Sequence, residues 1–67
     1  SFVHYLTRVR MEAAKTLMKE NPGLFIRDIA EMTGYGDQFY FSRIFRSVTG
    51  ESPSEYMEHM ASENGKN

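Results

Sequence analysis

The residues best suited to contact a ligand lie in one short segment, which reads GDQFYFSRIF and begins at Gly36. It combines three consecutive aromatic side chains with an amide, a hydroxyl and a guanidinium group. A surface helix has a single apolar stripe, so three aromatic residues in a row cannot all face the core. With a turn of about 100° per residue, one apolar sector gathers Phe41, Ile44, Phe45 and Val48. Phe39 lies almost opposite this sector, and Tyr40 lies at its margin, where a ring can be half buried with its hydroxyl in water.

The opposite face of this predicted helix carries groups that suit the DNA major groove. Its residues are Gln38, Phe39, Ser42, Arg43 and Arg46. In that groove arginine can bond both acceptors of guanine, glutamine can pair with adenine, and an apolar ring can lie against a thymine methyl group. Ser42 and Arg46 can bond phosphate and so fix the register on the duplex. A second interpretation stays open, in which Phe39 contacts a missing neighbour and the arginines are merely solvated.

Length and composition predict one small globular unit. The chain has 67 residues, of which 40% are apolar and 25% charged. It contains no cysteine, which excludes a disulfide scaffold and a thiolate zinc site. Charges such as Arg8 and Glu12 interrupt the first residues, so we expect no signal peptide. No uncharged run approaches the roughly 20 residues that cross a bilayer. We therefore expect a cytoplasmic protein without a membrane partner.

The net charge of −1 hides a segregation along the chain. Residues 1–19 carry four basic side chains against one acidic, and residues 37–50 carry two basic against one acidic. Residues 51–67 carry four acidic side chains against one basic. Nucleic-acid binding depends on where the charge lies, so the overall value neither supports nor excludes it.

A long helix is predicted before the aromatic segment, over residues 1–20. Ser1 is a suitable N-cap, and the Asn-Pro-Gly sequence at residues 21–23 supplies a stop. Phe25 is too apolar for a free loop, and we expect it to fold back onto the core. Apolar residues recur three and four positions apart, as in an amphipathic helix. The stripe comprises Phe2, Leu6, Val9, Ala13 and Leu17, widened by Tyr5, Met11, Ala14 and Met18.

A second and a third helix complete a recognisable pattern. The second spans residues 26–33 and is followed by Gly34, which favours a left-handed stop. Asp37 is a suitable N-cap for the third helix, residues 37–49, which Gly50 closes. Two helices joined by about three or four residues that include glycine are typical of the helix-turn-helix.

Ser52, Pro53 and Glu55 form a strong start signal for a fourth helix. Serine is a good N-cap, proline is tolerated at the first helical position, and a glutamate three residues after the cap completes a capping box. The helix is predicted to run from Pro53 to about Met60. Residues 61–67 are small and polar, and they are predicted to form a flexible tail.

Several motifs along the chain match those of one protein family. They are Tyr5 with Leu6, Arg10 with Met11, Asp28-Ile29-Ala30, Gly34 with Tyr35, Tyr40-Phe41-Ser42-Arg43, Phe45 with Arg46, Thr49 with Gly50, and Ser52 with Pro53. On these motifs the chain resembles the C-terminal part of the DNA-binding domain of AraC/XylS-type bacterial transcription regulators. In that family the domain holds two helix-turn-helix units joined by a long helix. Each unit inserts a helix into successive major grooves.

The resemblance implies an all-α, homeodomain-like helix-turn-helix, preceded by a long linker helix and followed by a short C-terminal helix. Residues 1–20 correspond to the linker helix, residues 26–60 to the C-terminal helix-turn-helix unit with its trailing helix, and residues 61–67 to the tail. The first unit is absent from the sequence, so we expect the full-length protein to hold it together with a regulatory or receiver domain. Asn21-Pro22 and Gly34-Tyr35 resemble the subset joined to two-component receiver domains.

The resemblance also assigns residues to DNA. The recognition helix, at about residues 38–49, directs Gln38, Phe39, Tyr40, Ser42 and Arg43 towards it. Phosphate contacts are expected from Arg46, from Ser42 and from Arg27 near the start of the second helix. Phe39 and Tyr40 occupy positions that vary in the family and are often polar, so the preferred base sequence stays open.

The sequence thus predicts binding of specific double-stranded DNA sites in bacterial transcription regulation, with a homodimer left open. The alternative is a helical protein-interaction module without DNA binding, which would use Phe39, the methionines of the fourth helix and the acidic C-terminus. No enzyme, catalytic residue or cofactor is predicted. His4 and His59 lie at opposite ends of the chain. Glu55 and His59 share a helix face, but such a pair is more often solvated than metal-binding, and no metal site is predicted.

Overall fold

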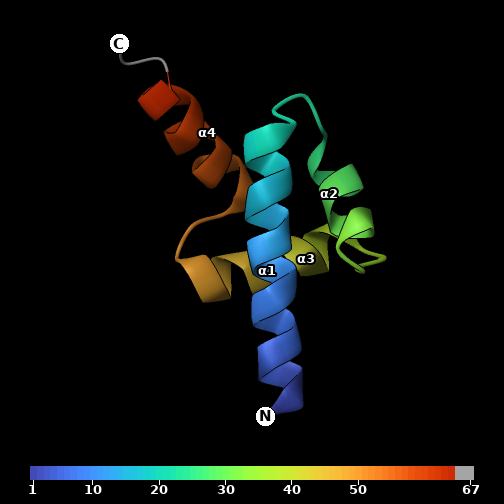
Figure 1. Cartoon of the computed structure of the whole chain (residues 1–67). Helices are drawn as coiled ribbons and strands as arrows, with labels where there is room; N and C mark the ends of the chain where they lie inside the picture. Colours follow the sequence, from blue (N-terminus) through green and yellow to red (C-terminus); the bar gives the residue numbers. More distant parts are fainter. Residues whose placement is uncertain (65–67) are drawn as a thin grey trace.

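The computed structural model describes residues 1–64 and builds them from four helices, with no strand in this range (Figure 1). The helices are α1 (Phe2–Glu20), α2 (Ile26–Met32), α3 (Gln38–Thr49) and α4 (Pro53–Asn64). The long α1 crosses α3 and contacts each of the other three helices. This arrangement confirms the predicted all-α helix-turn-helix with a long helix before it and a short one after it. None of the described helices is long and apolar enough to cross a membrane.

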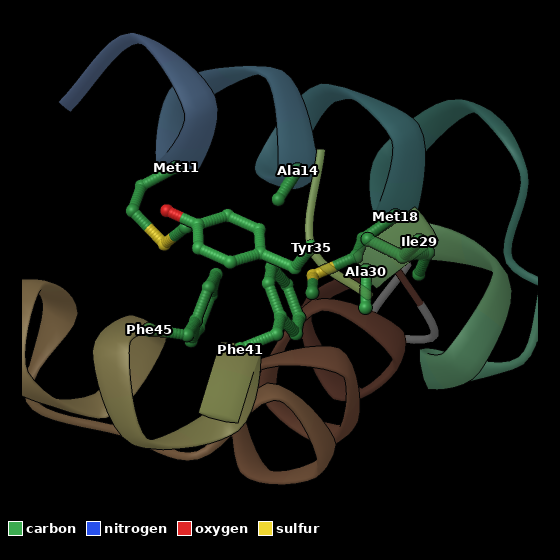
Figure 2. Packing of buried hydrophobic residues seen from close by; sticks show 8 residues of the cluster. All are labelled: Met11, Ala14, Met18, Ile29, Ala30, Tyr35, Phe41 and Phe45. Atoms are coloured by element: carbon green, nitrogen blue, oxygen red, sulfur yellow. The ribbon is translucent and has the colours of Figure 1, made fainter. Parts of the chain in front are cut away.

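The core forms where α1, α2 and α3 meet (Figure 2). Each helix contributes a few fully covered side chains, and the turn between α2 and α3 adds the ring of Tyr35. Rings then contact one another in series from Tyr35 through Phe41 and Phe45 to Tyr56 of α4, with centroids 5.5–5.9 Å apart. Such pairs stabilise by about 0.5–1.5 kcal/mol beyond the burial of their area. The buried set is Met11, Ala14, Met18, Ile29, Ala30, Tyr35, Phe41 and Phe45.

The apolar stripe of α1 was predicted only partly on the right residues. Leu17 packs against the core and Leu6 is partly buried, but the other positions of the main stripe are exposed. Met11, Ala14 and Met18, named only as widening positions, are the buried ones. Phe2 is 73% exposed and Val9 45% exposed. These residues are exposed because of the arrangement of the helices: the N-terminal part of α1 extends past the other helices (Figure 1). Helical spacing alone could not show where along α1 the core begins.

Phe25 does not fold back onto the core, contrary to the prediction. Its side chain is 66% exposed, and its extended backbone places it as the N-cap of α2. Leu24, the residue before it, is the one that packs against the core. Because neighbouring residues of an extended segment point to opposite sides, an inward Leu24 turns Phe25 outward. Phe25 offers no cap oxygen, but its N–H donates to the Asp28 carboxylate at 3.2 Å.

Polar caps fix the starts of the other helices, as predicted. The Ser1 hydroxyl accepts the N–H of His4 at 3.3 Å. At α4 the capping box is complete: Ser52 N–H donates to Glu55 Oε1 at 2.9 Å, and Glu55 N–H donates to Ser52 Oγ at 3.2 Å. These Ser52 bonds, the backbone one first, lower the pKa of Glu55 below its usual 4.5. The carboxylate therefore stabilises α4 fully above that value, and the contribution is lost as the pH falls through the lowered pKa.

The exposure of one side chain and the end of one helix also differ from the prediction. Val48, assigned to the apolar sector of α3, is 47% exposed, because that flank of α3 faces the open N-terminal part of α1. The fourth helix continues past Met60 to Asn64. Ala61 and Glu63 are good helix formers, and no glycine or proline interrupts the helix before Gly65. Residues 65–67 of the predicted tail lie outside the described residues.

The turn between α2 and α3 depends on one glycine and one arginine. Gly34 has a φ of +95°, in the left-handed region that favours glycine. The Arg10 guanidinium of α1 lies over the Tyr35 ring, 5.3 Å from its centroid, and only 3.3 Å from where a Cβ on Gly34 would be. Arg10 thus ties α1 to the turn. Gly36, two residues on, has open space at the Cβ position.

Replacing Gly34 by alanine is expected to lower the free energy of unfolding by about 1–2 kcal/mol, the usual cost of a left-handed residue that bears a Cβ. Urea denaturation followed by circular dichroism measures this loss. The matched control is Gly36→Ala, which is expected to stay within about 0.5 kcal/mol of the unchanged chain. Equal stability of the two variants would contradict the role of the turn conformation.

Candidate nucleic-acid interface

The candidate surface is the outer face of α3, and the sequence builds it by capping one end and burying the other face. The Asp37 carboxylate accepts the N–H of Phe39 at 2.8 Å and so starts the helix. Gly50, with a φ of +89°, ends it. Phe41 and Phe45 are completely buried on the inner face. Ile44 also packs against the core, so the side chains of the opposite face of α3 point outward.

The three consecutive aromatic residues separate as predicted. Phe41 is 0% exposed, Tyr40 is 47% exposed and Phe39 is 68% exposed. Arg43 and Arg46 are exposed, while Gln38 and Ser42 are partly buried. The structure thus brings five of the predicted DNA contacts onto one continuous face of α3: Gln38, Phe39, Ser42, Arg43 and Arg46. Tyr40 borders this face on the side nearest α1.

Arg43 is held against a ring. Its guanidinium carbon lies 5.7 Å from the centroid of the Tyr40 ring, and Tyr40 in turn contacts Tyr35 at a centroid distance of 5.9 Å. A stacked guanidinium keeps the donors at its edge free for bidentate bonding. The ring therefore limits the freedom of Arg43 before any ligand binds, which lowers the entropy lost on binding.

One of the predicted phosphate contacts already has a local partner. The Ser42 hydroxyl donates to the Gln38 carbonyl at 2.8 Å, so it must turn away from the helix before it can donate to phosphate. Arg46 lies close enough to Glu55 of α4 to help lower the pKa of that carboxyl group.

Arg27 meets the α3 surface at its N-terminal end. Arg27, Phe25 and Ile26 line one open hollow together with Gln38. The Arg27 guanidinium lies over the Phe25 ring, 5.5 Å from its centroid, and 4.0 Å from the Asp28 carboxylate. The start of α2 and the start of α3 therefore form one surface. In Figure 1, α4 lies on the opposite side of α1 from α2.

The structural role of Arg10 was not predicted from the sequence. There, Arg10 was only one of the positive charges and part of a motif shared with the family. Its place one residue before the buried Met11 was a signal that the side chain lies beside the core. Arg10 is partly buried and contacts the turn rather than the outer face of α3. It therefore positions the helix-turn-helix and is not a candidate DNA contact.

The possible metal pair of Glu55 and His59 is not assembled. The Nδ1 atom of His59 pairs with the Glu51 carboxylate instead, and Glu55 is used in the capping box. Within residues 1–64 no group of three side chains could hold a metal ion. The pair of Glu51 and His59 links the loop before α4 to the helix itself.

Comparison with known proteins finds a matching family model described as a helix-turn-helix domain, over residues 1–59. The chain is 46% identical over 55 residues to an uncharacterized HTH-type transcriptional regulator, YijO of Escherichia coli, a match that covers 82% of this chain and 19% of YijO. It is 45% identical over 56 residues to the uncharacterized transcriptional regulatory protein YesN of Bacillus subtilis, covering 82% of this chain and 15% of YesN. No solved structure matches.

A further relative is named for its activity. The chain is 45% identical over 58 residues to the HTH-type transcriptional activator Btr of Bacillus subtilis, a match that covers 87% of this chain and 11% of Btr. The chain thus spans less than a fifth of the length of each of these three relatives. Their names are those of transcription regulators, a class that is not enzymatic. The family model and the relatives together confirm the family predicted from the sequence motifs: the chain belongs to the AraC-type helix-turn-helix family of transcription regulators, which bind specific DNA sequences.

Proposed function

We propose that α3 enters the major groove of double-stranded DNA and reads base edges there, as part of a bacterial transcription regulator. One observation carries the proposal: α3 buries Phe41 and Phe45 completely and turns Gln38, Phe39 and Arg43 outward. Recognition helices of helix-turn-helix proteins read bases with their N-terminal residues, and these three residues lie in the first half of α3.

The proposed contacts divide between bases and phosphates. Arg43 has the donors for the two acceptors of guanine, and Gln38 can pair with adenine. Tyr40 borders the groove and holds Arg43. Arg27, at the start of α2, and Arg46 and Ser42, on α3, are proposed to contact phosphates and so set the register. Of these, Arg27 shares its hollow with Gln38, which supports a phosphate contact beside the base-reading end.

We also propose that the chain acts within a longer cytoplasmic protein that holds a first helix-turn-helix unit and a regulatory or receiver domain. The relatives are several times longer than this chain. The uncovered apolar side chains at the start of α1 support a neighbouring folded unit there, because a contiguous exposed apolar patch usually marks a surface that another unit covers. They are Phe2, Val3, Tyr5 and Val9. A homodimer of the longer protein would offer two copies of the α3 surface to adjacent half-sites.

Titration of a fluorescent random-sequence duplex at 50 mM and 200 mM salt tests the proposal. With two arginine–phosphate contacts, the affinity of this chain is expected to fall by about tenfold between the two salt concentrations. A version extended at its N-terminus is expected to bind more tightly and with a steeper salt dependence, because it neutralises more phosphates. If neither version binds any duplex, the proposed function is wrong, and the alternative of a protein-interaction module is favoured.

A further inference from the structure

The Phe39 side chain lies outside the buried core of the described residues. Its ring is 68% exposed, and the ring–ring and cation–ring contacts of the described residues do not include it. The other aromatic residues of α3 all have such contacts, with Tyr35, Tyr56, Arg43 or one another. Phe39 is thus an apolar group on a face that is otherwise polar.

The position of Phe39 is nevertheless well defined. Its N–H donates to the Asp37 carboxylate at 2.8 Å, and the following turns of α3 are fixed by the buried rings of Phe41 and Phe45. The ring therefore projects from the first turn of α3, beside Gln38. The nearby Asp37 carboxylate repels phosphate, which favours a position of the ring over the bases rather than against the backbone of the duplex.

We infer that Phe39 reads the 5-methyl group of a thymine in the major groove, an inference that rests on the proposed function. A phenylalanine ring has no conventional hydrogen-bonding group, so it cannot pair with the donors and acceptors of base edges. The C5-methyl group of thymine is the apolar group that the major groove presents. Burying it against the ring favours thymine, whereas cytosine at that position presents an N4 donor without a methyl group. Phe39 is therefore a specificity-determining residue for a T·A pair.

The test removes only the methyl group. Duplexes that bind this chain are selected from a random-sequence pool, and each thymine of a selected duplex is then replaced in turn by deoxyuridine. At one thymine the replacement is expected to weaken binding about fourfold, the factor for one methyl-sized group taken out of water. In Phe39→Ala that thymine and deoxyuridine are expected to bind equally, so the two changes are coupled.

The control variant is Phe2→Ala, which removes an exposed phenylalanine at the start of α1, outside the α3 surface, and should keep the fourfold preference for thymine. Circular dichroism should show Phe39→Ala folded, because its ring is exposed. A wild-type chain that is indifferent to deoxyuridine at every position overturns the inference and leaves the proposed function intact. So does a thymine preference that survives in Phe39→Ala. Failure to select any duplex overturns the proposed function and this inference with it.

Discussion

Replacing Phe41 by alanine is expected to unfold most of the chain, whereas replacing Phe39 is expected to leave its stability nearly unchanged. Phe41 is fully buried and contacts both Tyr35 and Phe45. Truncating such a side chain costs about 3–5 kcal/mol through lost burial and the cavity left behind. That is most of the stability available to a domain of this size. Phe39 makes none of these contacts, although it is the same residue type two positions away.

Urea denaturation followed by circular dichroism measures both variants against the unchanged chain. Phe39→Ala is the matched control, and its free energy of unfolding should stay within about 0.5 kcal/mol of the original. Phe41→Leu, which keeps much of the buried volume, should lose less than Phe41→Ala. Similar losses for Phe39→Ala and Phe41→Ala would contradict the assignment of the two rings to opposite faces of α3.

Replacing Arg43 by alanine is expected to cost about 1–3 kcal/mol of binding free energy at a selected DNA site and to relax the preference for one base pair there. The reason is that the guanidinium, held over Tyr40, offers two donors to the acceptors of a guanine. Fluorescence anisotropy with the selected duplex, and with duplexes changed at single base pairs, measures the affinity and the preference together.

Two variants separate the roles of the arginines in this experiment. Arg43→Lys keeps the charge but not the planar pair of donors, so it should lose the base preference while retaining part of the affinity. Arg46→Ala should weaken binding to all sequences alike and reduce the salt dependence by the amount of about one phosphate contact. If Arg43→Ala also weakens all duplexes equally, Arg43 contacts phosphate and does not read a base.

Local signals in the sequence predicted the helices and the two faces of α3 well. Asp37, Gly34, Gly50 and the Ser52 capping box act through their own backbone neighbours, so their effects can be read within a few residues. The outward position of Phe39 followed from helical periodicity alone, and its exposure confirms it. These features need no knowledge of what lies across the core.

The errors arose where a distant segment decides the outcome. Phe2 and Val9 of α1 have the right spacing for a core stripe, but no other helix reaches them. Phe25 is apolar, but Leu24 occupies the inward position. The spacing of apolar residues indicates which side chains share a face of a helix. It does not indicate which part of that face another helix packs against.

The candidate interface was predictable as a face but not in its contacts. The assignment of Gln38, Arg43 and the others to DNA remains a prediction. No sequence pattern indicated that Arg43 stacks on Tyr40 or that the Ser42 hydroxyl already donates to the helix backbone. Both depend on side-chain rotamers, which are chosen by the packed surroundings.

The unbroken α1 also has a consequence for spacing along DNA. It is a single helix of 19 residues, about 28 Å long, whose second half is packed into the core and whose first half extends beyond it (Figure 1). A unit attached at its start would be held at a set distance and angle from α3. Inserting one residue into the extended half would shift that unit by about 1.5 Å and rotate it by about 100°. The helix would thus set the distance and the relative orientation of two DNA-binding units, and its length would determine which spacings of the major groove they can occupy together.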